Sequence, residues 1–509
     1  MEAQKLRTVL VANRGEIACR VLRACRQRGL QTVAVYSDAD QHALHVSLAD
    51  TAICIGSASA RDSYLNIDAI LEAARKTDAD AIHPGYGFLS ENAAFAHACT
   101  EAGIVFIGPR AETIAHLGDK VEARRRMSAA GVPIVPGYQD GDFTPRRLEN
   151  EARKIGFPIL LKAAAGGGGK GMRIVHHPDE LTSALESAKR EAFKAFGDDR
   201  VFMERYIENP RHIEVQVFGD HQGHVVSLFD RECSIQRRHQ KVVEESPSPA
   251  LSDALRRDIC DVAVRAARAV DYVNAGTVEF MLDPEGRFYF LEMNTRLQVE
   301  HPVTEMVTGI DLVSLQLDIA QGQPIPFQQG DIAQQGHAIE VRIYAEDPQA
   351  GFVPSTGRIA LLREPHGPGI RVDSSLYQGL EIPVHYDPML AKVIAWGATR
   401  PEAIARLIDA LKDFILVGPT SNIDFLLDII RHPSFRKGET YTSFIDRHLT
   451  PWTPKETLPS LDHIIAAAMT EMATIDNRSR HIPNATGEAS SPWTTLKNWR
   501  HFQTSSGQR

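Results

Sequence analysis

Residues 159–175, with the sequence ILLKAAAGGGGKGMRIV, hold four consecutive glycines between two β-type runs. The runs at residues 159–162 and 172–175 predict two antiparallel strands joined by a glycine-rich loop. Glycine lets several backbone N–H groups approach an anion, so this loop, with Gly167, Gly168 and Gly169 at its centre, predicts a flap over a nucleotide phosphate. It is not a Walker A loop, which needs Ser or Thr after its lysine and a helix behind it. A flexible surface hairpin is the alternative interpretation.

Upstream of this loop, short β-type runs alternate with segments of helical spacing. Strands are expected at residues 8–12, 31–36, 51–55, 81–83 and 105–108, and helices at residues 16–28 and 67–76. This alternation predicts a parallel, doubly wound α/β domain over residues 1–115. The turn HPGYGF at residues 83–88 follows one predicted strand at its carboxyl end, where such sheets bind ligands, so Tyr86 is a candidate site residue. A plain Gly/Pro turn is the alternative.

Downstream, the pattern changes from alternation to hairpins. Residues 116–334 are expected to form an α+β domain that includes the flap at residues 134–205. Residues 335–449 mix strands at 338–344 and 390–396 with helices at 401–414 and 422–431, which predicts a C-terminal mixed α/β domain. Residues 450–509 begin with several prolines and continue as a polar stretch, which predicts a linker or an incomplete element.

Composition excludes several classes of protein. The 509 residues carry 65 acidic and 56 basic side chains, a formal charge of −9, whereas a dedicated nucleic-acid binder usually has a basic surface. The six cysteines form no CxxC pair, which argues against a zinc site or a disulfide framework and favours a reducing compartment. No apolar run is long enough to span a membrane, and patterned sequence begins by Leu6, which leaves no room for a targeting peptide. We therefore expect a cytoplasmic protein that binds neither nucleic acid nor membrane.

Glu279 and Glu292 lie on two β-type runs around a turn at residues 283–286. If that turn is a four-residue loop, Glu279 faces Phe290, and Glu292 is its diagonal neighbour on the same face. Both carboxylates could then reach one or two Mg²⁺ ions. A one-residue slip of the register breaks this argument, and two solvent-facing acids on an edge hairpin are the alternative.

The following stretch alternates polar and other side chains at a spacing of two. Its polar members are Glu292, Asn294, Arg296, Gln298 and Glu300. An extended chain would place all of them on one face. That face would offer metal ligands, a guanidinium for a small oxyanion and a carboxylate that can take a proton. An exposed polar strand face is the alternative, but it would more often be rich in Lys and Thr.

Several cations are candidates for binding anions. Lys162 ends an apolar run, and a lysine at the end of a buried strand is costly unless it meets an anion. Lys162 and Lys120 could therefore hold nucleotide phosphates, although each could also be a surface lysine that keeps its charge in water. The run RRHQK at residues 237–241 contains His239 and Lys241, and it predicts a pocket for a phosphate and a second anion. A solvated face is the alternative for this run.

Taken together, these motifs resemble the biotin carboxylase component of the biotin-dependent carboxylases, which are ATP-grasp enzymes. The resemblance runs from about Val9 to His448. Its specific marks are ANRGEIA at residues 12–18, HPGYGFLSEN at 83–92, the glycine-rich loop, RRHQK at 237–241, and the segment from EMN at 292–294 to EHP at 300–302. It implies an ATP-grasp central domain and a reaction in two steps. Bicarbonate attacks the γ-phosphate of ATP to give carboxyphosphate, which releases CO₂ to a deprotonated biotin nitrogen.

The resemblance also implies a role for each matching residue. The residues that would hold ATP are Lys120, Lys162, Glu204, His212 and His239, with Gly167, Gly168 and Gly169 closing above and Glu279 and Glu292 beside it. The residues that would bind Mg²⁺ or Mn²⁺ are Glu279, Glu292 and Asn294. Those that would hold bicarbonate are Lys241, Arg296, Gln298 and Val299. Glu300 would deprotonate bicarbonate, Arg342 would stabilise the enolate oxygen of biotin, and Tyr86 and Asp387 would line the biotin pocket.

The end of the sequence bears on partners. Family members that carry biotin have an Ala-Met-Lys-Met site, whereas AMTEM at residues 468–472 has no lysine. We therefore expect biotin to arrive on a separate carrier protein, with the carboxyltransferase also on another chain and a homodimer as the family expectation. YDPM at residues 386–389 and HPSF at 432–435 resemble the α subunits of acyl-CoA carboxylases, such as those for acetyl-CoA or methylcrotonyl-CoA. Through SPW at 491–493 and WR at 499–500, the tail at residues 450–509 resembles the start of the linking domain of such subunits. The alternatives are an ATP-grasp ligase for another carboxylate, the biotin-carboxylating subunit of a pyruvate carboxylase, and a catalytically silent scaffold.

Overall fold

The computed structural model describes residues 5–138, 145–164, 172–238 and 240–454, together with Ile465 and Met469. Residues 1–453 form one compact unit, and residues 454–509 are assigned to a second. The predicted flap loop with Gly167, Gly168 and Gly169, the candidate His239, and nearly all of the predicted tail lie outside the described residues.

The N-terminal sheet consists of parallel strands in the order β3-β2-β1-β4-β5. The strands are β1 (Thr8–Val11), β2 (Gln31–Ser37), β3 (Thr51–Gly56), β4 (Ala81–His83) and β5 (Val105–Phe106). Successive side chains of a strand point to opposite faces, so Val9 packs with α1 (Gly15–Gln27) and Leu10 with α3 (Ile67–Lys76). Helices therefore cover both faces, and the predicted doubly wound arrangement is confirmed.

A smaller sheet carries the two strands predicted on either side of the glycine-rich loop. Its order is β6-β9-β7-β8. The strands are β6 (Gly137–Tyr138), β7 (Ile159–Ala163), β8 (Arg173–Val175) and β9 (Val201–Arg205), and the helices beside them are α7 (Pro145–Ile155) and α8 (Leu181–Phe196). β7 and β8 are antiparallel with Ile159 opposite Val175, as predicted. The loop that joins these two strands is the glycine-rich segment.

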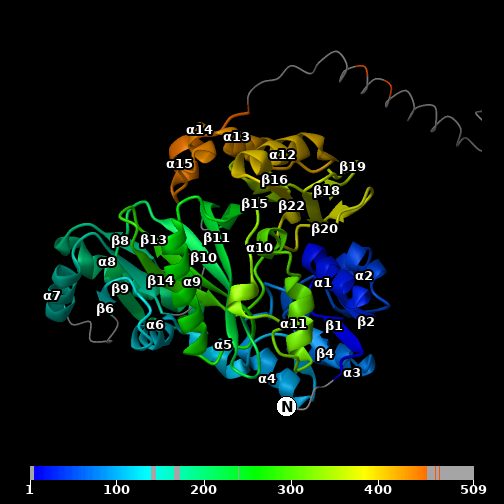
Figure 1. Ribbon diagram of the computed structural model, residues 1–509, viewed down its shortest axis with the longest axis horizontal. Helices are drawn as coiled ribbons and strands as arrows, with labels where there is room; N and C mark the ends of the chain where they lie inside the picture. Colours follow the sequence, from blue (N-terminus) through cyan, green and yellow to red (C-terminus); the bar gives the residue numbers. More distant parts are fainter. Residues whose placement is uncertain are drawn as a thin grey trace, which may run out of the picture. The chain divides into compact units, whose positions relative to one another are not determined.

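The largest sheet, whose strands run from green to yellow in Figure 1, is antiparallel and has the order β14-β13-β10-β11-β12-β15-β22-β20. Its strands are β10 (Arg211–Gly219), β11 (Val225–Arg237), β12 (Gln240–Ser246), β13 (Asn274–Leu282), β14 (Phe288–Asn294), β15 (His337–Tyr344), β20 (Ile370–Ser374) and β22 (Met389–Gly397). Because β12 pairs with β15, one sheet runs through both of the segments that the sequence analysis separates near residue 335. That boundary stays a prediction.

The longer helices cover one face of this sheet, and the opposite face carries rows of charged residues beside α10 (His301–Thr308), whose Val303 and Val307 pack with Ala338 and Ile394. α9 (Asp253–Arg268) packs on Val278 and Phe280 of β13, while α12 (Arg400–Asp413) and α13 (Ile423–Arg431) pack on β15 and β22. Alternation then directs Glu279 to the opposite face. In register, Glu292, Glu279, Glu214 and Arg231 follow one another across β14, β13, β10 and β11. Arg342, Lys392 and Asp373 form a second such row across β15, β22 and β20.

The register predicted for the hairpin of β13 and β14 is wrong near the turn. Leu282 pairs with Phe288 and Phe280 with Phe290, because the loop has one residue more than the four assumed. A β-bulge, in which Leu291 has no partner opposite Glu279 and Phe280, then shifts the pairing by one more residue in the same direction. Glu279 and Glu292 are therefore direct cross-strand neighbours, closer than the diagonal arrangement expected.

Two shorter helices follow this hairpin, α10 (His301–Thr308) and α11 (Leu312–Ala320). In the part of the chain that the structure describes, no helix combines the length and the apolar character needed to cross a membrane.

Candidate active site

A buried lysine lies at the centre of the candidate site. Lys241, near the start of β12, has its Nζ 2.5 Å from Glu214, 2.8 Å from Glu279 and 2.7 Å from Glu300. Burial alone would lower the pKa of Lys241, but these carboxylates raise it well above its usual range. Lys241 is therefore a fixed positive charge shared by carboxylates from β10, β13 and the residue before α10.

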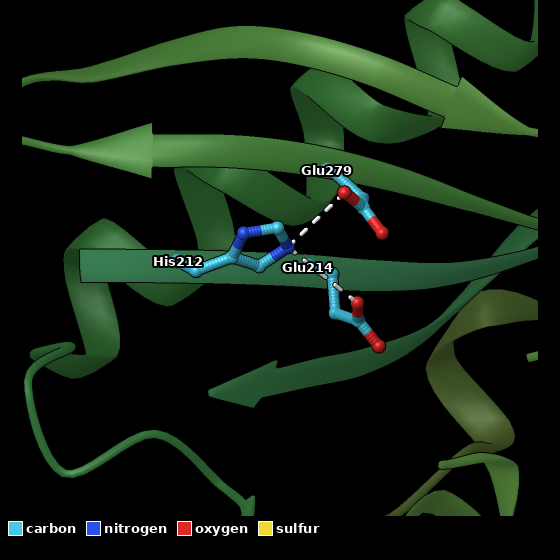
Figure 2. A group of neighbouring side chains, drawn as sticks. All are labelled: His212, Glu214 and Glu279. Carbon is cyan, nitrogen blue, oxygen red and sulfur yellow. Dashed lines mark ion pairs between the residues drawn. The ribbon is translucent and has the colours of Figure 1, made fainter. Parts of the chain in front are cut away.

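The candidate metal ligands gather beside Lys241 on neighbouring strands. Figure 2 shows His212 and Glu214, both on β10, with Glu279 of β13, whose Oε2 lies 3.1 Å from His212 Nε2. Asn294 donates to Glu279 over 2.8 Å. Burial would raise the pKa of Glu279, but Lys241 and His212 lower it below its usual range, so this carboxylate is ionised.

The fit of a divalent cation can be judged from Glu292. Its pKa is raised by burial and by the negative charge of Glu279 directly opposite, although its side chain keeps 40% of its surface exposed. A hard cation between the two carboxylates would remove this repulsion, and oxygen ligands are those that Mg²⁺ prefers. The residues present therefore fit such an ion.

The stretch after Asn294 does not continue as a strand. β14 ends at Asn294, the chain bends, and α10 begins at His301. The side chains meet nevertheless, because Arg296 donates to Gln298 over 2.8 Å and Gln298 donates to Glu279 over 3.1 Å. The extended chain predicted for this stretch is thus wrong beyond Asn294, while the convergence expected of its polar side chains is observed.

Glu300 is completely buried and joins the metal side of the site to Arg342. Lys241 donates to one oxygen of Glu300 over 2.7 Å, and Arg342 donates to the other over 3.0 Å. Arg342 is itself held by Glu244 at 2.6 Å. Burial would raise the pKa of Glu300, but Lys241, Arg342 and Arg231 lower it well below its usual range. Glu300 is therefore an ionised carboxylate between two cations.

The residues predicted to hold a nucleotide lie on the adjoining elements. Lys162 of β7 pairs with Glu204 of β9, 2.5 Å away, and Arg124 also binds Glu204. Lys120 begins α6 (Lys120–Ala129), and its Nζ lies 3.9 Å from Glu292. Lys120 and Lys162 are thus both placed with carboxylates of the site.

The two candidate biotin residues are not joined by any contact among the described residues. Tyr86 is half-buried and its hydroxyl donates to Glu16 at the start of α1. Asp387 is exposed and accepts from the backbone N–H of Met389 over 2.8 Å. Asp387 is therefore accessible from solvent, whereas the side chain of Tyr86 is held by its hydrogen bond to Glu16.

Sequence reasoning missed several residues that hold the site together. Arg231 is completely buried and donates to Gln216, Thr277 and Thr304 over 2.8 to 3.0 Å, and also to Glu214. The alternation of His212, Glu214 and Gln216 along one apolar run was the signal that could have found this face of β10. Glu244 and Lys392 were also missed, because Lys392 is a lone charge within β22 and Glu244 stands beside Glu245 in β12, so neither belongs to a motif with its own spacing.

Comparison with known proteins gives consistent family matches. The model described as "Biotin carboxylase, N-terminal domain" matches residues 5–114, and "Biotin carboxylase C-terminal domain" matches residues 340–447. Between them, "Carbamoyl-phosphate synthase L chain, ATP binding domain" matches residues 119–328.

Curated relatives carry two kinds of name. The chain is 53% identical over 441 residues to a biotin carboxylase of Halalkalibacterium halodurans, and the match covers 87% of this chain and 97% of that protein. It is 50% identical over 462 residues to the alpha subunit of the mitochondrial methylcrotonoyl-CoA carboxylase of Mus musculus, covering 91% of this chain and 64% of that protein. The chain therefore spans less than two thirds of the length of this second relative.

Solved structures agree with these matches. The biotin carboxylase domain dimer of Hydrogenobacter thermophilus 2-oxoglutarate carboxylase, in complex with MgADP, ADP and bicarbonate, superposes with a TM-score of 0.85 at 46% identity. That comparison covers 89% of this chain and all of the other. A biotin carboxylase complex from Campylobacter jejuni also gives a TM-score of 0.85, at 45% identity, covering 87% of this chain and 99% of the other.

Proposed function

Because this chain belongs to the biotin carboxylase family, we propose that it carboxylates biotin on a carrier protein, using MgATP and bicarbonate, through carboxyphosphate. Its fold is the mixed α/β architecture of that family, with an ATP-grasp central domain. The observation that carries the proposal is the buried cluster of Lys241, Glu300 and Arg342 beside the carboxylate pair Glu279 and Glu292.

The nucleotide would lie along the carboxylate pair. Lys120 and Lys162 would neutralise its phosphates, and Glu204 would fix the Lys162 ammonium. Further contacts in this proposal come from His212, His239 and the loop with Gly167, Gly168 and Gly169. Mg²⁺, held by Glu279, Glu292 and Asn294, would supply charge neutralisation at the transferred phosphoryl group; Mn²⁺ would suit the same oxygen ligands.

Bicarbonate would bind where Lys241 now bridges carboxylates. Lys241, Arg296, Gln298 and the Val299 backbone would hold it, and Glu300 would remove its proton. Without substrate, the contacts of Glu300 with Lys241 and Arg342 keep its pKa low. An anion bound beside Lys241 would compete for its charge, so the pKa of Glu300 should rise toward a range in which it can accept a proton. The bicarbonate oxygen then attacks the γ-phosphorus, and the bond from this phosphorus to ADP breaks.

Arg342 would serve the second step. Carboxyphosphate would break down to CO₂ and phosphate, the phosphate would take the proton of the biotin nitrogen, and this nitrogen would then bond to CO₂. Ionisation of that nitrogen places negative charge on the ureido oxygen of biotin, and a guanidinium held by Glu244 and Glu300 is oriented to stabilise it. Tyr86 and Asp387 would line the ring of biotin.

The proposed partners are a biotin carrier and a carboxyltransferase that completes an acyl-CoA carboxylase. An acceptor of the acetyl-CoA or methylcrotonyl-CoA kind agrees with the name of the Mus musculus relative. We further propose a homodimer, since the Hydrogenobacter thermophilus structure is described as a dimer. Light scattering should then give twice the chain mass of 56.2 kDa.

The test of the proposed function is ADP release by the purified chain with Mg²⁺, with and without bicarbonate and with and without free biotin. Release that requires bicarbonate and increases with biotin supports the proposal. Release that is indifferent to both, or that proceeds equally with another carboxylate in place of bicarbonate, would identify an ATP-grasp ligase of other specificity. No release at all would indicate the scaffold.

A further inference from the structure

Lys392 is a charged residue in the middle of an apolar strand, and none of its surface is exposed. Its Nζ donates to the backbone carbonyl of Val299 over 2.7 Å. Glu16 lies 3.2 Å and Asp373 lies 3.7 Å from the same Nζ. A buried ammonium is costly unless its charge and its donors are satisfied, so these three contacts explain how Lys392 is tolerated.

The contact with Val299 reaches the loop that carries the bicarbonate residues. A peptide group is planar, so fixing the carbonyl of Val299 also fixes the direction of the Glu300 N–H. Gln298 precedes this peptide group, and Glu300 follows it as the residue before α10. Lys392 therefore sets the backbone from which Gln298 and Glu300 extend.

A separate series of contacts beside Lys392 leads to α10 and does not include the loop residues. Asp373 pairs with Arg371 at 2.8 Å, and Arg371 reaches Glu305 of α10 at 2.6 Å. Lys392 is also the direct cross-strand partner of Arg342. Each of these two cations has its own carboxylate partners. Glu244 and Glu300 contact Arg342, and Glu16 and Asp373 lie beside Lys392.

On its other side, Lys392 reaches the first domain. Glu16 accepts a hydrogen bond from the hydroxyl of Tyr86, and the Tyr86 ring centre lies 6.0 Å from Lys392 Nζ. One ammonium thus connects the proposed biotin residue Tyr86 to the proposed bicarbonate residue Val299.

We infer that Lys392 is a positioning residue for bicarbonate, which holds the peptide group between Val299 and Glu300 in the orientation that the first chemical step requires. This inference rests on the proposed function, because it assigns the loop around Val299 to bicarbonate. It adds a residue that touches none of the reacting atoms and acts only through the loop.

The test is Lys392→Met in the full chain, which keeps a long apolar stem and removes the ammonium. Bicarbonate-dependent ADP release and MgATP affinity are measured in parallel. We expect kcat/KM for bicarbonate to fall by about a hundredfold, the scale of a small misplacement of reacting groups. The Kd for MgATP should change by less than about twofold, because the nucleotide residues are held by other contacts.

Asp373→Asn is the matched control. It removes one of the charges beside Lys392 but leaves the hydrogen bond to Val299, so kcat/KM for bicarbonate should stay within about threefold of wild type. If Lys392→Met does not fold, the double variant Lys392→Met/Asp373→Asn removes one charge of each sign and takes its place.

The outcomes separate this inference from the proposed function. If wild type requires bicarbonate and the lysine variant keeps its kcat/KM for bicarbonate, the positioning role is wrong and the proposed function stands. A parallel loss of MgATP affinity, or an equal loss in Asp373→Asn, would reduce Lys392 to a general structural role. If wild type does not require bicarbonate, both fall together.

Discussion

At the scale of a single residue, the carboxylate of Glu300 is held in place and kept ionised by its neighbours. It has no exposed surface, and its two oxygens face different cations, Lys241 and Arg342. Its two neighbours belong to the two proposed steps, bicarbonate activation and biotin ionisation. A change in either contact would therefore alter the pKa of the same carboxylate.

Glu300→Gln tests the proposed base directly. The amide keeps nearly the same shape but cannot take a proton, so biotin carboxylation should fall by roughly a hundredfold or more while MgATP binding is retained. Steady-state carboxylation and nucleotide titration give the two readings. Glu285→Gln, at an exposed carboxylate of the hairpin loop, should leave both unchanged. A normal rate in Glu300→Gln would remove this residue from the mechanism.

Arg342→Ala distinguishes the two steps. Because the guanidinium is proposed to stabilise ionised biotin, its loss should reduce biotin carboxylation more than bicarbonate-dependent ATP cleavage. Both rates are compared in the same preparation. An equal reduction of the two would assign Arg342 to the first step instead.

The individual elements show where sequence reasoning worked and where it did not. Helix α3 and strand β4 have the bounds predicted from their periodicity, because local spacing alone determines them. The β-bulge beside Glu279 and the bend after Asn294 left no such signal, since bulges and bends depend on pairing with another strand. Glu279 and Glu292 were correctly predicted to be neighbours across two strands, but by a register that is wrong.

Strands β10 and β11 are joined through the buried Arg231. The variant Arg231→Met would leave one buried oxygen of Glu214 without its cation, while Lys241 still binds the other oxygen. This loss should lower the free energy of unfolding by about 3 kcal/mol or more. Urea denaturation followed by circular dichroism measures the change. Arg153→Met serves as the control, because the ion pair of Arg153 with Glu149 is exposed and should contribute little. Equal midpoints for the two variants would contradict the account of this buried cluster.

The contact of β12 with β15 and α12 should make stability depend on pH. Burial would raise the pKa of Glu245, but His337 and Arg400 lower it from 4.5 to about 2. The unfolded chain therefore binds this proton more readily, and the stabilisation is present above about pH 4.5 and lost as the pH falls toward 2.

Urea midpoints measured between these pH values compare wild type with Glu245→Gln. Wild type should lose stability more steeply on acidification, and the difference between the two proteins should shrink as the pH falls. Parallel pH profiles would show that Glu245 has no depressed pKa in the folded protein.

At the scale of the whole molecule, the site is assembled from residues distant in sequence. Glu16 and Lys392 meet although the N-terminal sheet and the last strands of the large sheet lie far apart in the chain. The net charge of −9 describes the whole chain and gives no indication that cations cluster at the site. Site residues that are close together in the sequence, such as residues 292–300, could be predicted from their spacing. The position of Lys392 beside the site depends on the order of strands in the sheet, which the sequence around Lys392 does not encode.

The most direct test of the central claim is the transfer of labelled carbon from bicarbonate to free biotin by the purified chain. The account predicts acid-labile label on biotin that requires both ATP and Mg²⁺ and that is reduced by roughly a hundredfold in Glu300→Gln. ADP formation without labelled biotin, or labelling that is independent of ATP, would contradict it.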